Sequence, residues 1–453
     1  MDDDYRRLAD RIADDIASGR LRPGERLPPQ RAFARRRGIA GSTAGRVYGE
    51  LVRRGLVVGE VGRGTFVRAA PPAPNGRALA EPVAATALAP RVNMELNYPS
   101  APGQSELLAP ALAPLLRPDV LTEALRPAPA DGTPEARKAV AGLLVTPGWR
   151  PAPDGVLFAG NARQAIAATL ASLVRPGGRV GVEALTYPLV KEIAARLGIV
   201  LVPLAMDQDG VRPDALVAAH RSAPLSALYV QPTLHNPTSV TMGEGRRREL
   251  ARVVRELGVP VVEDRIWSFL TDKEAGDPLA AHVPELAHVV DGLSKRVAPG
   301  LTVGFLVVPP DRAEAVAAAV RSGGWSAGRF ALEAGVRWIE DGTVARLVAA
   351  KRLDAARRQR LLARELAEFE GAVRSDPYAY YAWWELPASW RADTFTAAVA
   401  AHGIAVTPGD AFAVGPQRAP DAVRLGLASA PEPELARALR TLAAVARRGR
   451  TGR

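Results

Sequence analysis

The chain has 453 residues, of which 47% are hydrophobic, and it carries a formal net charge of +11. This length predicts two or three domains, and the apolar content excludes wholesale disorder. No apolar run reaches the roughly 18–20 residues needed to cross a bilayer, so we expect no membrane partner. The chain contains no cysteine, which excludes disulfides, thiolate catalysis and cysteine-based zinc sites. The acidic start, Met1 to Asp4, is unlike a signal peptide, and we expect a cytoplasmic protein.

The positive charge is concentrated near the N-terminus. Residues 20–68 contain twelve arginines and no lysine against three glutamates, so about a tenth of the chain carries most of the excess charge. A local basic segment is typical of proteins that bind nucleic acid. The alternative, that arginine simply replaces lysine throughout, explains the choice of residue but not the clustering.

Residues 1–68 have the pattern of a small helical domain that ends in a hairpin. The predicted elements are helices over 5–18, 30–37 and 42–54 and strands over 56–58 and 65–67. Ser42 or Thr43 is expected to cap the third helix, and Gly38 and Gly55 are expected to end the second and third. Three helices and a hairpin predict a winged helix-turn-helix.

In a winged helix-turn-helix, the third helix enters the major groove of double-stranded DNA and the flanking elements contact the backbone. A glycine-rich wing lets the chain approach phosphates or the minor groove closely. The residues expected to contact DNA are Arg31 and Arg35 on the second helix, Ser42, Thr43 and Arg46 on the third, and Arg63 and Gly64 in the wing.

Three short motifs make the resemblance specific. They are Leu-Pro-Pro-Gln-Arg at 27–31, Tyr-Gly-Glu-Leu at 48–51 and Gly-Arg-Gly-Thr-Phe-Val at 62–67. With these motifs, residues 5–68 resemble the GntR-type DNA-binding domain. Gly41 and Gly45 stand where that family often has a long side chain, so base recognition is expected to depend on Arg46 and the wing. A winged helix that serves only protein contacts is the alternative.

Residues 69–92 separate this domain from the rest of the chain. The segment is rich in proline and alanine and has no periodic apolar face. Such a composition predicts a linker, either a semi-rigid spacer or a flexible tether.

Residues 93–446 alternate short apolar runs with helical patterns. The strands are expected over 156–158, 180–182, 200–204, 225–230, 259–263, 289–291 and 303–308, with helices such as 164–174, 189–197 and 246–257 between them. Continuous apolar strands separated by helices predict an α/β fold, a mainly parallel sheet with helices on both faces. From about residue 350 the pattern changes to a long helix, mixed strands and a final helix, which predicts a small α+β subdomain.

Lys295 is the most informative residue of this second domain. It follows the strand at 289–291 in a loop of small residues, whereas the contexts of the other four lysines, among them Lys351, are typical of solvated surface. Ligand sites of such sheets lie at the carboxyl ends of the strands. A lysine that is desolvated there has a lowered pKa and can attack an aldehyde.

Other residues at strand ends complement this lysine. Asp264 can pair with a protonated pyridine nitrogen, Asn236 can donate to a phenolate oxygen, and Tyr187 can stack on a ring. The turn at 160–164 joins a strand to a helix start, where backbone amides favour phosphate, and Arg424 can pair with a carboxylate. Each residue alone has an ordinary structural explanation, but the combination in this order is much harder to explain that way.

Together these residues resemble the fold-type-I, aspartate-aminotransferase-like family over residues 93–446, and the whole chain resembles the MocR subgroup of GntR regulators. The resemblance implies pyridoxal 5'-phosphate as cofactor, a Schiff base at Lys295 and a head-to-tail homodimer. It also implies that Asp264 holds the pyridine nitrogen, Asn236 the ring oxygen, Tyr187 the ring face and Arg424 the carboxylate of an effector. The phosphate neighbours are then Asn161, Ala162 and Arg163.

Two positions depart from the pattern of that family. Trp267 stands where a tyrosine is usual, and an indole cannot act as a phenol. Thr302 stands where the phosphate-binding arginine is common, and Ser294, Thr302 and Arg296 or Arg163 are expected to supply replacement contacts. Both changes weaken the case for efficient transamination more than the case for binding.

The sequence therefore leads to three hypotheses. The first is a DNA-binding transcription regulator that responds to pyridoxal phosphate, to an amine or amino acid, or to both. The second is an aminotransferase with an accessory DNA-binding head, and the third is a regulator whose second domain has lost the cofactor and only dimerises.

Overall fold

The structure, a computed structural model, describes residues 4–17, 20–21, 24–60, 64–68, 91–271, 276–300, 303–415 and 419–448. Arg63, Thr302 and nearly all of the expected linker lie outside the described residues. None of the helices in the described ranges is both long enough and apolar enough to span a membrane.

The N-terminal unit is the expected winged helix-turn-helix. Its elements are α1 (Asp4–Ala17), β1 (Arg26–Leu27), α2 (Gln30–Arg37), α3 (Gly41–Arg53), β2 (Val57–Glu60) and β3 (Gly64–Val67). The strand β3 lies between β1 and β2, and it pairs antiparallel with both. Ala9, Phe33, Val47, Leu51 and Val67 belong to the apolar core that the three helices and the sheet share.

Two details of this unit differ from the prediction. The helix α3 begins at Gly41 with Ala40 as its N-cap residue, so neither Ser42 nor Thr43 caps it. Before α2, in a strand that was not among the predicted elements, Arg26 and Leu27 form β1. A β-carbon at Gly64, whose φ is +124°, would lie 2.5 Å from Nε of Arg26, so the wing needs glycine here.

The second unit contains a large sheet built from all seven predicted strands. They are β5 (Val156–Ala159), β6 (Arg179–Glu183), β7 (Val200–Leu204), β10 (Ala227–Val230), β11 (Val261–Asp264), β12 (Ala287–Gly292) and β13 (Gly304–Val307), in the order β5-β13-β12-β11-β10-β6-β7. Within this sheet, β13 alone runs in the direction opposite to the other strands. The central strands are buried along their whole length, which accounts for their continuous apolar sequence.

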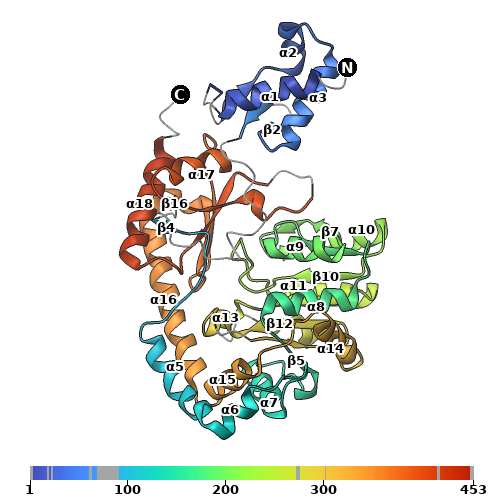
Figure 1. Cartoon of the computed structure of the whole chain (residues 1–453), viewed down its shortest axis with the longest axis vertical. Coiled ribbons are helices and arrows are strands. Elements are labelled where there is room, and N and C mark those ends of the chain that lie inside the picture. Colours follow the sequence, from blue (N-terminus) through green and yellow to red (C-terminus); the bar gives the residue numbers. More distant parts are fainter. Residues whose placement is uncertain are drawn as a thin grey trace.

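Helices cover this sheet (Figure 1). They include α8 (Ala162–Leu173), α9 (Pro188–Leu197), α10 (Pro213–Ser222), α11 (Glu244–Leu257), α12 (Leu279–His282), α13 (Leu293–Arg296) and α14 (Ala313–Ser322). The hairpin of β8 (Met206–Asp207) and β9 (Gly210–Val211) connects β7 to α10. Another group packs near β5 and consists of α5 (Gln104–Leu112), α6 (Pro118–Ala124), α7 (Pro134–Leu143) and α15 (Arg329–Glu340). The α8 face and the α11 face form two separate apolar clusters, so the sheet is the middle of three layers.

The long helix α16 (Thr343–Glu365) leads to the small subdomain. Its sheet has the order β14-β15-β18-β17, with β14 (Val373–Ser375), β15 (Tyr381–Glu385), β17 (Thr407–Pro408) and β18 (Ala422–Gly426), and α17 (Ala392–Ala400) and α18 (Glu432–Arg448) complete it. β4 (Val92–Asn93) pairs in parallel with β16 (Ile404–Ala405). Val92, expected as the last linker residue, therefore already belongs to this unit.

Candidate functional site

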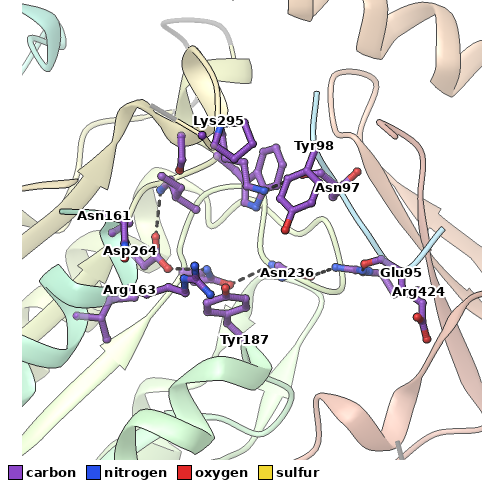
Figure 2. Close-up of a pocket in the computed structure, with 18 residues that line it drawn as sticks. Glu95, Asn97, Tyr98, Asn161, Arg163, Tyr187, Asn236, Asp264, Lys295 and Arg424 are labelled. Carbon is purple, nitrogen blue, oxygen red and sulfur yellow. Dashed lines mark hydrogen bonds between the residues drawn. The ribbon is translucent and has the colours of Figure 1, made fainter. Parts of the chain in front are cut away.

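A cavity of about 450 Å³ lies at the carboxyl ends of the central strands, next to the small subdomain. Asp264 ends β11, Lys295 follows β12, and Arg424 comes from β18 of the small subdomain. Figure 2 shows these three side chains, with Tyr187 and Asn236, around one space. The chain thus brings together residues that are far apart in the sequence, and Lys295 and Asp264 lie at the carboxyl ends of parallel strands.

Lys295 lies on the short helix α13, with its amine inside the cavity. Its Nζ donates to the carbonyl of Asn97 at 2.7 Å and lies 4.6 Å from the centre of the Tyr98 ring and 5.1 Å from that of Trp267. Burial, with the positive charges of Arg424, Arg163 and Lys351, lowers the pKa of Lys295 to about 7. A large fraction of this amine is therefore neutral and nucleophilic at neutral pH.

Asp264 is held by a buried set of donors. Its Oδ2 accepts from the hydroxyl of Tyr229 at 2.7 Å and from Nε2 of Gln231 at 2.8 Å, and its Oδ1 accepts from the amide of Ile266 at 3.0 Å. Burial nevertheless raises the pKa of Asp264 to about 6. Three donors fix the carboxylate in place, and burial favours pairing it with a cation.

Arg424 and Asn236 are linked across the two subdomains. The Nη1 of Arg424 donates to Oδ1 of Asn236 at 3.4 Å, and its Nη2 contacts the carbonyl of Glu95 and Oγ1 of Thr407. Within the described part of the chain, the buried Nε of Arg424 makes no hydrogen bond. A donor without an acceptor in a buried site fits a guanidinium that receives a ligand carboxylate.

The start of α8 forms another wall of the cavity. Asn161 is its N-cap residue and accepts from the amide of Gln164 at 3.0 Å, while Asn161, Ala162 and Arg163 line the cavity. A β-carbon on Gly304 would lie 2.3–2.7 Å from backbone atoms of Asn161 and Ala162. Only glycine at this position of β13 therefore allows the strand to lie so close to the turn. A helix start beside an exposed arginine is a suitable place for phosphate.

The remaining predicted residues divide into three groups. Tyr187, Trp267 and Ser294 line the cavity, and burial raises the pKa of Tyr187. Arg296 does not line it, because its guanidinium is buried against Asp291 and the carbonyl of Gly292. Thr302 lies outside the described residues.

Several cavity residues were missed by the sequence interpretation. Glu95, Asn97 and Tyr98 line the cavity from the segment that follows β4, and Gln231 and Ile266 line it near Asp264. Gln231 stands five residues before Asn236 in the sequence, and its amide was the available signal. The segment around Asn97 carries no recognisable motif. It reaches the cavity only because it pairs with distant parts of the chain, so no local sequence signal could have found it.

The expected DNA-contacting residues form an exposed set on the N-terminal unit. Arg31 and Arg35 on α2 and Ser42 and Arg46 on α3 are exposed, and Thr43 is partly exposed. The guanidinium of Arg46 lies over the ring of Tyr5 at 4.2 Å. Arg63 lies outside the described residues, and Gly64 begins β3.

Two families account for most of the chain. The sequence profile of aminotransferase class I and II matches residues 122–442, which is more than half of the protein. The chain belongs to this family. Bacterial regulatory proteins of the gntR family match residues 4–67, so the chain is a GntR-type regulator fused to an aminotransferase domain, the MocR arrangement.

Individual proteins agree with this domain organisation. The chain is 29% identical over 418 residues to the uncharacterized HTH-type transcriptional regulator YdeF of Bacillus subtilis, covering 92% of this chain and 88% of that protein. It is 27% identical to the HTH-type transcriptional regulator TauR of Rhodobacter capsulatus, covering 69% of each. Its fold matches the crystal structure of an archaeal alanine:glyoxylate aminotransferase with a TM-score of 0.72 and 19% identity, covering 79% and 91% of the two chains.

The cofactor of this aminotransferase class is pyridoxal phosphate, and the cavity fits it. A buried lysine with a lowered pKa, a fixed carboxylate and a helix start occupy three sides of one space. Arg424 lines a further side, where an amino acid attached to such a cofactor needs a partner for its carboxylate.

Proposed function

We propose that this protein is a transcription regulator whose affinity for DNA changes when pyridoxal phosphate, an amine or amino acid, or both occupy the cavity at Lys295. The observation that carries the proposal is the position of Lys295 Nζ, which lies in the cavity with Asp264 and Arg424 and donates to the carbonyl of Asn97. The GntR-type domain at the N-terminus of the same chain is the part that binds DNA.

The residues of the cavity have separate tasks in holding the ligand. We assign Lys295 to covalent attachment, Asp264 to the pyridine nitrogen and Asn236 to the ring oxygen, with Tyr187 against the ring. Asn161, Ala162, Arg163 and Ser294 hold the phosphate, and Trp267 forms part of the wall. When bound, pyridoxal phosphate supplies an aldehyde for amines and an electron-withdrawing ring. Arg424 then selects amines that carry a carboxylate.

The segment from Met94 to Asn97 connects Lys295 with the small subdomain. Asn97 accepts from Lys295 through its carbonyl and from the amide of Ala428 through Oδ1, at 2.7 and 3.1 Å. The amide of Gly426, at the end of β18, donates to the carbonyl of Met94 at 2.7 Å. Covalent attachment at Nζ would leave it at most one of its three N–H donors, so its interaction with Asn97 would differ between the free and the loaded chain.

We infer a head-to-tail homodimer, because paired half-sites on DNA require two heads and aminotransferase-like proteins are often dimeric. Movement of the small subdomain then changes the spacing of the two DNA-binding heads. A cytoplasmic location follows from DNA as the partner. A second candidate, an aminotransferase with an accessory head, is favoured by the intact set of Lys295, Asp264, Asn236 and Arg424.

The experiment measures DNA binding with and without ligand. A DNA fragment is selected by the purified protein from a random pool, and its dissociation constant is measured without additions, with pyridoxal phosphate, and with pyridoxal phosphate plus each of the common amino acids. The proposal predicts at least a fivefold change that is lost in Lys295→Ala. Unchanged affinity, together with amino-acid turnover that Lys295→Ala abolishes, supports the enzyme instead.

A further inference from the structure

Lys351 is a second buried lysine beside the cofactor lysine. It lies on α16 and was expected at the surface, but its side chain is fully buried. Its Nζ donates to the carbonyls of Lys295, Arg296 and Val297, at 3.0, 3.0 and 2.7 Å. The surface prediction failed because α16 packs this position against α13, which no local pattern in the sequence indicates.

These three carbonyls belong to the end of α13, where a helix leaves its last carbonyls without partners inside the helix. An ammonium has three N–H donors, whereas a neutral amine has two, so three acceptors match the protonated form of Lys351. Burial opposes that form and lowers the pKa of Lys351 to about 7. The charge on Lys351 in turn contributes to the lowered pKa of Lys295.

The helix α16 also holds the small subdomain. The Nη1 of Arg358 donates to the carbonyls of Leu427 and Ala430 at 2.6 Å each, and Nε2 of Gln359 donates to the carbonyl of Ala379 at 2.6 Å. The hydroxyl of Tyr380 donates back to the carbonyl of Lys351 at 2.7 Å. One helix therefore contacts the segment that carries Lys295 and the residues that follow β18, the strand of Arg424.

We propose that Lys351 is a positioning residue: it fixes the Lys295 segment to α16, and through α16 it couples occupation of the cavity to the small subdomain. The coupling rests on the proposed function, whereas the positioning of Lys295 does not. The charged and titratable groups around this contact are Lys295 and Arg296 on α13, Asp354 and Arg358 on α16, and Tyr380 before β15.

The positioning role is tested on cofactor-free protein by the reactivity of Lys295. The rate of acetylation of Lys295 by acetic anhydride is followed by mass spectrometry from pH 5 to 10 in wild type, Lys351→Met and the milder Lys351→Gln. Loss of the neighbouring charge and looser burial both raise the pKa of Lys295. A rise of about one pH unit slows acetylation at pH 7 roughly fivefold.

Lys191→Met is the matched control for this experiment. Lys191 is partly buried and donates to two carbonyls, but these belong to Ala411 and Ala413 and not to α13. In Lys191→Met, we expect the rate of Lys295 acetylation to depend on pH as it does in wild type. If Lys351→Met does not fold, Lys351→Gln decides the question. A wild-type profile in the folded Lys351 variant overturns the positioning role.

The coupling is tested by hydrogen exchange of residues 422–430. Pyridoxal phosphate and a bound amino acid are expected to change exchange there in wild type and Lys191→Met, and to change it less than half as much in Lys351→Met. An equal response in Lys351→Met, measured with the cofactor bound, overturns the coupling. No cofactor binding in wild type contradicts the proposed function, while the acetylation profile still decides the positioning role.

Discussion

The hydroxyl of Tyr229 donates a 2.7 Å hydrogen bond to Oδ2 of Asp264, and both side chains are buried. This bond stabilises the ionised carboxylate, so Tyr229→Phe raises the pKa of Asp264 further above its present value of about 6. A protonated Asp264 cannot pair with a cationic pyridine nitrogen. We expect pyridoxal phosphate to bind roughly tenfold more weakly, as measured by equilibrium dialysis. Tyr48→Phe, which removes a buried hydroxyl in the DNA-binding unit, is the control, and equal affinities in both variants contradict the role of Tyr229.

Lys295 makes stability depend on pH. Its pKa is about 7 in the folded chain and about 10.4 in an unfolded one, so the unfolded chain binds more protons between these values. Stability therefore rises with pH through this window, and below about pH 7 the full cost of the buried charge is present. Urea unfolding of cofactor-free protein should show wild type gaining stability relative to Lys295→Met from about pH 7 to about pH 10. Parallel curves contradict the lowered pKa.

Arg424 should distinguish amino acids from simple amines. Its unsatisfied Nε and its position on β18 predict that Arg424→Gln weakens binding of an amino acid roughly tenfold or more, with little effect on the amine that lacks the carboxylate. Calorimetry with alanine and ethylamine on the cofactor-loaded protein measures this ratio. Arg163→Gln should instead weaken binding of the cofactor and leave the ratio of alanine to ethylamine affinity unchanged. An unaltered ratio in Arg424→Gln shows that the carboxylate binds elsewhere.

The arginines of the DNA-binding unit should separate into two classes. Arg46→Ala, on the first turns of α3, is expected to cost about 1–3 kcal/mol on a selected DNA site and to relax base preference. Arg35→Ala should weaken binding to all DNA sequences alike. It should also reduce the salt dependence of binding by the amount expected for about one phosphate contact. Arg53 pairs with Glu50 at the other end of α3, so Arg53→Ala serves as the control. Similar losses in all three variants exclude this assignment.

Much of the fold could be predicted because its signals are local. Each strand of the large sheet contains a short apolar run, and α2 ends at Gly38 in a left-handed conformation, as a helix followed by glycine should. Prediction failed where tertiary packing decides. The helix α3 begins without a side-chain cap, and β1 forms only because β3 offers an edge.

The same division holds for the cavity. Lys295, Asp264, Asn236 and Tyr187 stand at strand or helix ends, where sequence patterns are informative. Arg296 was expected near the phosphate, but Asp291 holds it in the interior. A lysine that is buried by a neighbouring helix has the same local pattern as one at the surface, which is why Lys351 was misinterpreted.

The absorption spectrum with pyridoxal phosphate tests the central claim most directly. Wild-type protein and Lys295→Ala are each mixed with the cofactor, freed of excess by gel filtration and scanned through the near-ultraviolet and visible range. We predict a yellow band that remains with wild type and is absent from Lys295→Ala, and that shifts when an amino acid is added. Absence of the band from both proteins would contradict cofactor attachment at Lys295 and leave the second domain as a dimerisation scaffold.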